Sequence, residues 1–430
     1  MYSFPPFLYL LCRKGIVLNK IRGGTVVNTT VTPEGVPVIT ADPFSSENLM
    51  EPHMLHEQMR EAGPVVSLEA YDTLWGMARY EQVNAALKDY ETFSSAAGAG
   101  LSNFQKEKPW RAPSLLLEAD PPFHTRAREV VGPILAPPVI KALQGNFQRE
   151  AIELVDRLIT LGSFDAMTQL AEVYTLKVFG DALGLPEEGR ENLLPYANMV
   201  FNGFGPRNQL LAEAMANAQP VLQWVTKSCS REALRPGSFG AQIWAAADAG
   251  KIPEEWAPLL VRSLISAGLD TTISGIAATI YALASHPEQW SILRQDPSLA
   301  KSAFEETIRW ESSVQTFFRT TTREVEVAGV HIPAGEKMLL FLGSANRDPR
   351  RWNNADSFDI RRNASGHVGF GMGIHRCVGQ TVSRVEAEVL LTALVQRVER
   401  IEITGQLQRK PNNTMRAWSS IPVTLYPIAS

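Results

Sequence analysis

A glycine-rich stretch of ten residues, 370–379, constrains this chain more than any other part of its sequence. It places a single cysteine, Cys377, shortly before a segment that is predicted to be helical from Gln380 onward. The three glycines of the stretch permit left-handed backbone or the close approach of another group. Because Cys377 precedes a helix, the N-terminal end of the helix dipole favours its thiolate. The stretch can therefore hold a flat ligand against glycine backbone, with the sulfur directed at the centre of that ligand.

Cys377 has two interpretations. An isolated cysteine is most often a small buried core residue, whereas a thiolate can also bind the iron of a haem. Phe370, Gly373 and His375 lie seven, four and two residues before Cys377, and Gly379 lies two residues after it. This pattern resembles the haem-binding loop of the cytochrome P450 family. The resemblance covers residues 35–430 and implies a mainly α-helical single domain with a small β portion, in which haem b lies between a long central helix and the cysteine loop.

The totals of the sequence agree with a large globular domain. Of its 430 residues 45% are hydrophobic, and a formal net charge of -4 with mixed signs gives no indication of nucleic acid or of an anionic membrane surface. Cysteines at only three positions, with no paired spacing, favour a reducing cytoplasm. The apolar run at residues 4–12 is too short to span a bilayer. We expect residues 1–34 to be a loose extension, and we expect the protein to be a monomer.

Local patterns predict the main elements. Residues 36–40, 64–67 and 73–78 are predicted to be short strands of a small sheet, and residues 55–61 and 81–89 to be helical. From residue 121 to residue 293 most segments have helical periodicity, with breaks at Pro137, Gly184, Pro206 and Pro236. Residues 259–285 are predicted to form the long central helix.

The middle of this predicted helix contains weak helix formers, which often mark a functional site. Ala267 and Gly268 leave space beside the helix, while Asp270 and Thr271 bring an acid and a hydroxyl to that space. The resemblance implies an oxygen-binding groove, in which Thr271 assists dioxygen and its proton donors and Asp270 relays protons. The alternative is that the Thr271 hydroxyl bonds back to the carbonyl four residues earlier and that Asp270 pairs with an arginine.

The resemblance also implies which side chains surround the haem. Buried propionates need cationic or hydrogen-bonding partners. The positions that match such partners in the family are His124, Arg128, Arg319 and His375. Further residues expected beside the haem are Phe370, Gly371, Gly379, Ala267 and Gly268. Glu306, Arg309 and Arg362 are expected to form a buried charge network that supports the cysteine loop, although alone such an i, i+3 pair is a common surface ion pair.

A candidate substrate site follows from one constellation. Ser263 and Ser266 share the helical stripe that carries Asp270, while Arg111 and Ser114 lie in a proline-interrupted loop; an arginine with several hydroxyls is suited to a carboxylate. The other residues assigned to this pocket are Leu117, Phe201, Phe204 and Phe317, of which the phenylalanines would form a slot for an aromatic ring. The set resembles that of bacterial members that oxidise para-substituted benzoic acids, which implies O-demethylation of 4-methoxybenzoate or hydroxylation of a para-alkyl group. The alternative is a solvated Arg111, serines that face another helix and phenylalanines that belong to the core.

The chain contains no nicotinamide or flavin fingerprint and no iron–sulfur cysteine set. Electrons from NAD(P)H are therefore expected through a [2Fe-2S] ferredoxin and its reductase, with Arg376 among the residues that would dock an acidic partner. Two other functions stay open: a peroxygenase of the same fold that acts on a fatty acid, and a haem-bearing binding or sensor protein without turnover. Both have little need of the Asp270–Thr271 pair, which argues against them.

Overall fold

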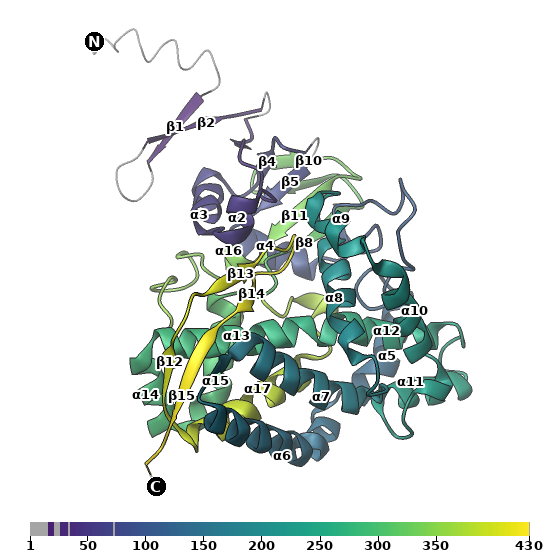
Figure 1. The fold of residues 1–430 in the computed structure, drawn as a ribbon. Coiled ribbons are helices and arrows are strands. Elements are labelled where there is room, and N and C mark those ends of the chain that lie inside the picture. The colour runs from purple at the N-terminus through teal and green to yellow at the C-terminus, as the bar shows by residue number, and fades with distance from the viewer. Residues whose placement is uncertain (1–15, 21–25, 33–34, 72–73, 430) are drawn as a thin grey trace, which may run out of the picture.

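The computed structural model describes residues 16–20, 26–32, 35–71 and 74–429 (Figure 1). About half of this part of the chain is helical. The α-helices are α2 (Ser46–Met50), α3 (His53–Ala62), α4 (Tyr80–Lys88), α5 (Phe123–Ile134), α6 (Pro137–Leu161), α7 (Glu172–Leu183), α8 (Leu193–Asn202), α9 (Gln209–Met215), α10 (Ala218–Ser228), α11 (Phe239–Asp248), α12 (Trp256–Gly268), α13 (Asp270–Ser285), α14 (Pro287–Gln295), α15 (Ala300–Trp310), α16 (Leu342–Ala345) and α17 (Gln380–Val395). Short helices of other kinds are η1 (Ala166–Ala171, a π-helix), η2 (Arg190–Asn192), η3 (Arg231–Ala233), η4 (Pro297–Leu299) and η5 (Gly373–His375).

The strands form several small sheets. They are β1 (Ile16–Lys20), β2 (Val26–Thr30), β3 (Val38–Ile39), β4 (Val66–Leu68), β5 (Leu74–Met77), β6 (Phe93–Ser94), β7 (Ser163–Asp165), β8 (Thr316–Thr321), β9 (Val325–Val327), β10 (Val330–Ile332), β11 (Lys337–Phe341), β12 (Val398–Ile403), β13 (Gln408–Lys410), β14 (Ala417–Ser420) and β15 (Pro422–Pro427). The largest has six strands in the order β3-β4-β5-β11-β8-β6, with β11 parallel to β5 and antiparallel to β8. The predicted small sheet near the N-terminus is confirmed, and it is completed by β8 and β11 from late in the chain.

The helices pack into one body beside this sheet (Figure 1). One core cluster joins α6, α13, α15 and α17 with β12 and β15, and a second joins α5, α7, α8, α10, α11 and α12. Figure 1 shows α13, of the first cluster, and α12, of the second, following one another across the middle of the molecule. The mainly helical single-domain fold that the sequence predicts is therefore confirmed.

Helix boundaries follow local chemistry at the predicted breaks. α6 begins with Pro137 at its first position, where a missing N–H costs nothing. α7 ends at Gly184, which adopts the left-handed conformation (φ 87°) and donates its N–H to the Gly180 carbonyl. Pro206 and Pro236 each precede a capped helix start, at Asn208 and Ser238 respectively, whose side chains accept a backbone N–H.

Residues 121–293 depart from the predicted helical series at one place. β7 pairs with β15, and the π-helix η1 follows it, with the Asp165 side chain accepting from the N–H groups of Met167 and Thr168. Because the partner strand lies more than 250 residues later, local periodicity cannot predict this pairing.

The central helix also differs from its prediction. Instead of one regular helix over residues 259–285, α12 ends at Gly268 and α13 begins at Asp270, with Leu269 between them at φ −95° and ψ −71°. By length and composition Trp256–Ser285 could cross a membrane, but 78% of its most apolar window is buried inside the fold. Packing inside the protein therefore accounts for its apolar character.

The expected loose extension at residues 1–34 lies largely outside the described residues. Within it, β1 pairs antiparallel with β2, from Ile16 opposite Thr30 to Lys20 opposite Val26.

Candidate active site

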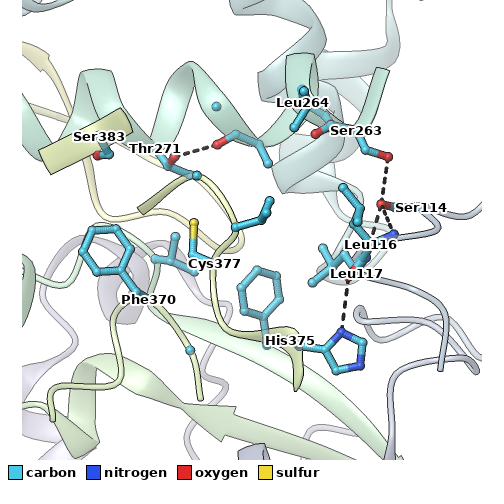
Figure 2. Close-up of a pocket in the computed structure, with 18 of the residues that line it drawn as sticks. Ser114, Leu116, Leu117, Ser263, Leu264, Thr271, Phe370, His375, Cys377 and Ser383 are labelled. Atoms are coloured by element: carbon cyan, nitrogen blue, oxygen red, sulfur yellow. Dashed lines mark hydrogen bonds between the residues drawn. The ribbon is translucent and has the colours of Figure 1, made fainter. Parts of the chain in front are cut away.

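A cavity of about 210 Å³ lies between α12, α13 and the cysteine loop. The cavity wall also includes the 111–117 loop, the end of α8 and the strand β8. Segments that are far apart in the sequence therefore line the same cavity. Figure 2 shows the sulfur of Cys377 on the side of the cavity that faces Thr271, with Ser114 and Ser263 at the opposite end.

The cysteine loop is held by backbone bonds and by its glycines. Cys377 donates its N–H to the Phe370 carbonyl (2.8 Å), which closes the loop. Gly371 and Gly373 have φ of 67° and 65°, which side chains with a Cβ resist. A Cβ on Gly373 would also lie 2.7 Å from the carbonyl oxygen of Leu87 in α4. The expected need for glycine at these two positions is therefore explained by the geometry.

The electrostatics at Cys377 combine opposing effects. Burial raises the pKa of the Cys377 thiol, while the N–H groups of Gly379 and Gln380 and the charges of Arg128 and Arg384 lower it. Helix α17 begins at Gln380 as predicted, so the helix N-terminus does favour the thiolate. Burial is the larger effect, so the pKa of the thiol is raised overall, and a cation bound at the sulfur would lower it.

A buried charge network lies behind this loop. Glu306 and Arg309 in α15 have fully buried side chains and form a bidentate pair, with both N···O distances 2.7 Å. Arg362 joins them through its Nε, 3.0 Å from Glu306 Oε1. Arg309 also donates to the carbonyl oxygens of Asn346 and Ala355. The network thus fastens the segment that leads into the cysteine loop, as the sequence predicts.

Basic side chains gather at one edge of the cavity. Arg128, Arg319 and His375 line it, and the His124 ring lies 4.5 Å from the His375 ring, just behind the wall. Arg319 is 2% exposed; burial lowers its pKa to about 10, and it donates to the Phe318 carbonyl at 2.7 Å. Among the described residues, His124 Nε2 is buried without a hydrogen-bond partner. Asp120 acts on Arg319 only through its charge and lies 3.3 Å from His375 Nε2. A buried arginine and an imidazole nitrogen without a partner among the described residues are suited to an anionic ligand group.

The central helix brings Thr271 to the cavity, but not Asp270. The Thr271 hydroxyl donates to the Ala267 carbonyl at 2.7 Å, which is the local bond of the alternative interpretation, yet the residue still lines the cavity. Asp270 is 7% exposed and lies behind the wall; burial raises its pKa, and Lys410 rather than an arginine opposes that effect. The space beside Gly268 is occupied by Phe179, whose Cζ would be 2.4 Å from an added Cβ.

The far end of the cavity contains the residues predicted to bind a carboxylate. Ser114 Oγ lies 2.9 Å from Ser263 Oγ, and Ser263 in turn donates to the Leu259 carbonyl at 2.8 Å. Ser266 donates to the Arg262 carbonyl at 3.0 Å. All three hydroxyls therefore have protein acceptors here, although each residue lines the cavity.

Arg111 is not solvated. Its side chain is 11% exposed and its Nη1 lies 2.8 Å from Glu118 Oε2. Glu118 Oε2 also accepts the backbone N–H of Ser114 at 2.8 Å. Among the described residues, the Arg111 Nε is buried without a partner. Arg111 thus reaches the cavity as half of an ion pair.

The aromatic slot is present between the two ends. The ring centroids of Phe201 and Phe204 are 6.0 Å apart, and those of Phe204 and Phe317 are 5.7 Å apart, all in edge-to-face arrangements. These rings and Leu117 line the same cavity as Cys377. They are also part of the core packing, so the two interpretations of the phenylalanines are not exclusive.

Three residues that shape the site were missed from sequence. Glu118 pairs with Arg111, Arg262 donates to the Ala112 carbonyl at 2.6 Å, and Lys337 donates to the carbonyl oxygens of residues 97, 98 and 100. Arg262 directly precedes Ser263, so its place on the helix gave a signal. Glu118 and Lys337 are charged residues with no local pattern that separates them from surface residues.

Comparisons with known proteins agree with this geometry. The family description "Cytochrome P450" matches residues 248–425. The chain is similar to cytochrome P450 CYP199A2 of Rhodopseudomonas palustris, with 55% identity over 91% of this chain and 95% of the relative. The chain therefore belongs to the cytochrome P450 family of haem-dependent monooxygenases.

Solved structures give the same fold. Cytochrome P450 CREJ in complex with (4-ethylphenyl) dihydrogen phosphate has a TM-score of 0.81 at 25% identity and covers 90% of this chain and 99% of its own. P450BioI, in complex with an acyl carrier protein ligated to hexadec-9Z-enoic acid, has a TM-score of 0.77 at 27% identity over 88% of this chain and 100% of its own.

The residues of this chain fit the haem that the family implies. Cys377 would bind its iron, and Arg128, Arg319, His375 and His124 would hold its propionates. Once bound, haem supplies the activation of dioxygen.

Proposed function

We propose that this monooxygenase, through its domain of residues 35–430, oxidises a small aromatic carboxylic acid at the para position. The favoured reaction is O-demethylation of 4-methoxybenzoate, and hydroxylation of a para-alkyl group is its counterpart. One observation carries the proposal: the cavity has hydroxyls and a guanidinium at one end, Cys377 at the other and an aromatic wall between them. A para-substituted benzoate has the same order of groups along its length.

The polar end would hold the carboxylate. Ser114 accepts from the N–H groups of Leu116 and Leu117, and Ser263 donates to Leu259, so the hydroxyl proton between the two serines comes from Ser114. A carboxylate can take over the Ser263 proton from the Leu259 carbonyl by a rotation of one hydroxyl. The unpartnered Nε of Arg111 would give a charge-assisted bond.

The other end would bring the para group to the reacting position. Phe201, Phe204 and Phe317 would orient the ring and exclude water from it. Thr271, on the wall above Cys377, would hold a proton donor beside dioxygen. Asp270, behind that wall, would pass protons inward, and burial raises its pKa.

Electrons would come from outside the chain. We infer a [2Fe-2S] ferredoxin with an NAD(P)H-dependent reductase, in the cytoplasm, as the supply. Arg376 is exposed in the cysteine loop and would contact an acidic ferredoxin.

The test is a reconstituted turnover assay. With NADH, a ferredoxin and its reductase, 4-methoxybenzoate is expected to give 4-hydroxybenzoate and formaldehyde in equal amounts, with consumption of dioxygen. The neutral analogue 4-methoxytoluene serves as the control that lacks a carboxylate. No product from the acid, with hydrogen peroxide alone driving oxidation of a fatty acid, would instead establish a peroxygenase. Haem binding without any turnover would establish a binding or sensor protein.

A further inference from the structure

Glu118 is a buried carboxylate one step behind the polar end of the cavity. Its side chain is 2% exposed, and its Oε2 accepts both from Arg111 Nη1 and from the N–H of Ser114, each at 2.8 Å. Glu118 itself does not line the cavity, whereas Arg111 and Ser114 do. It therefore acts on a ligand only through its charge and through the two groups that it holds.

The fixed charges at this end can be counted. The charges of Arg111 and Glu118 cancel, and Arg262 adds one positive charge beside them. Burial lowers the pKa of Arg262, while the charges of Arg111 and Glu118 act on this pKa in opposite directions. Tyr196 and Cys229 face the same cluster, and burial raises both of their pKa values, that of Cys229 to about 12. Both are thus uncharged at neutral pH. Lys337, whose pKa burial lowers to about 7, is held by the carbonyl oxygens of residues 97, 98 and 100. Apart from Lys337, the end that would meet the substrate has one net positive charge.

This count discriminates between acids. A singly charged acid would bring the buried cluster to neutrality, whereas a doubly charged acid would leave an uncompensated negative charge beside apolar walls, which is costly. The cavity wall is mostly apolar, with leucine and phenylalanine side chains between the polar end and Cys377. Solvent therefore gives little screening to an excess charge.

We propose that Glu118 is a specificity-determining residue that restricts this enzyme to singly charged acids, an inference that rests on the proposed function. It cancels one of the two guanidinium charges and turns Arg111 so that Nη1 is occupied and Nε stays open. Without the Glu118 charge, the same pocket would accept an aryl dianion of equal size.

The sharpest probes are 4-methylphenyl sulfate and 4-methylphenyl phosphate. Their tetrahedral head groups have nearly the same shape, but at pH 8 the sulfate is a monoanion and the phosphate a dianion, because its second pKa is about 6. Binding is followed by the spin-state change of the ferric holoenzyme in a phosphate-free buffer, with 4-methoxybenzoate as the reference ligand. The wild type is expected to bind the sulfate at least about thirtyfold more tightly than the phosphate.

The test variant is Glu118→Gln, whose amide oxygen still accepts from Arg111 and Ser114. The ratio of the two dissociation constants is expected to fall by at least about tenfold, because one unit of positive charge attracts a dianion twice as strongly as a monoanion. Glu107→Gln is the matched control: Glu107 lies in the same loop, is half-buried and pairs with Arg207 at the surface, and the loss of its charge should leave the ratio unchanged.

The outcomes separate the two proposals. A wild type that does not bind 4-methoxybenzoate rejects the proposed function itself. A wild type that binds 4-methoxybenzoate but shows a sulfate-to-phosphate ratio below about three rejects only the role of Glu118. An equal loss of affinity for both probes in Glu118→Gln would also reject it, since that is the result of a merely structural residue. If the Glu118→Gln variant does not fold, a wild-type ratio below about three still rejects the role of Glu118.

Discussion

Gly100→Ala tests whether the aromatic slot depends on the loop behind it. An added Cβ at Gly100 would lie 2.7 Å from the Phe204 Cα and 2.8 Å from its carbonyl oxygen, where ordinary contact begins at 3.4 Å. About 0.7 Å of separation is therefore missing, and the obstacle is backbone. Gly100 has no positive φ, so the substitution acts through this contact and not through backbone strain.

The loop has little freedom to move away. Lys337 donates to the Gly100 carbonyl at 2.8 Å, and Leu101 donates to the Phe204 carbonyl at 2.8 Å. To relieve the clash of the added Cβ, either these hydrogen bonds must break or Phe204, which lines the slot, must move. Overpacking of this kind costs about 1–3 kcal/mol. With an unfolding entropy of about 2.1 cal/mol/K per residue over 430 residues, the thermal midpoint should fall by about 1–3 °C.

The assay combines thermal unfolding with the optical titration of 4-methoxybenzoate. Gly100→Ala is expected to lower the midpoint and to raise the dissociation constant. Gly145→Ala is the matched control, because Gly145 lies in α6 and an added Cβ meets nothing within 4 Å. It should stabilise the protein by up to about 1 kcal/mol and leave binding unchanged. Unchanged stability and unchanged affinity in Gly100→Ala would refute the reasoning.

Three further predictions concern the network, the central helix and acid stability. Glu306→Gln leaves Arg309 as an uncompensated buried cation and should cost about 3–5 kcal/mol, seen as loss of haem and of the thiolate-type carbon monoxide spectrum; a stable variant with full haem would contradict this. Thr271→Ala should retain haem and substrate binding but divert electrons to hydrogen peroxide, so the product formed per NADH should fall; an unchanged yield would remove the role of Thr271. Burial raises the pKa of Glu305, but hydrogen bonds from His367 and Arg384 outweigh it and hold the pKa at about 2. Because this pKa lies below the unfolded value of 4.5, the contribution of Glu305 is complete above about pH 4.5 and is lost as the pH falls toward 2, so the destabilisation by Glu305→Gln should shrink over that range in acid unfolding.

The cysteine loop could be predicted because its chemistry is local. Cys377 and its glycines lie within ten residues, and the left-handed φ values of Gly371 and Gly373 explain why the motif has its spacing. The pair of Glu306 and Arg309 is similarly local, three residues apart on one helix.

Other features depend on contacts between distant residues, which the spacing of residues along the sequence does not predict. Local periodicity predicts one continuous helix and does not show the break at Leu269. Phe179, from another helix, occupies the space that Gly268 leaves. Glu118 was missed for the same reason: its bonds to Arg111 and Ser114 exist only once the loop has folded.

The most direct test of the account is an optical titration of the ferric protein with 4-methoxybenzoate and with its methyl ester. The acid is expected to convert the haem from low to high spin with a dissociation constant of about 1–100 µM, and the neutral ester to bind at least about tenfold more weakly. That result would support the haem, the aromatic slot and the acid-binding end together. Equal binding of acid and ester, or no spin change with either, would contradict a cavity built for an aromatic carboxylate.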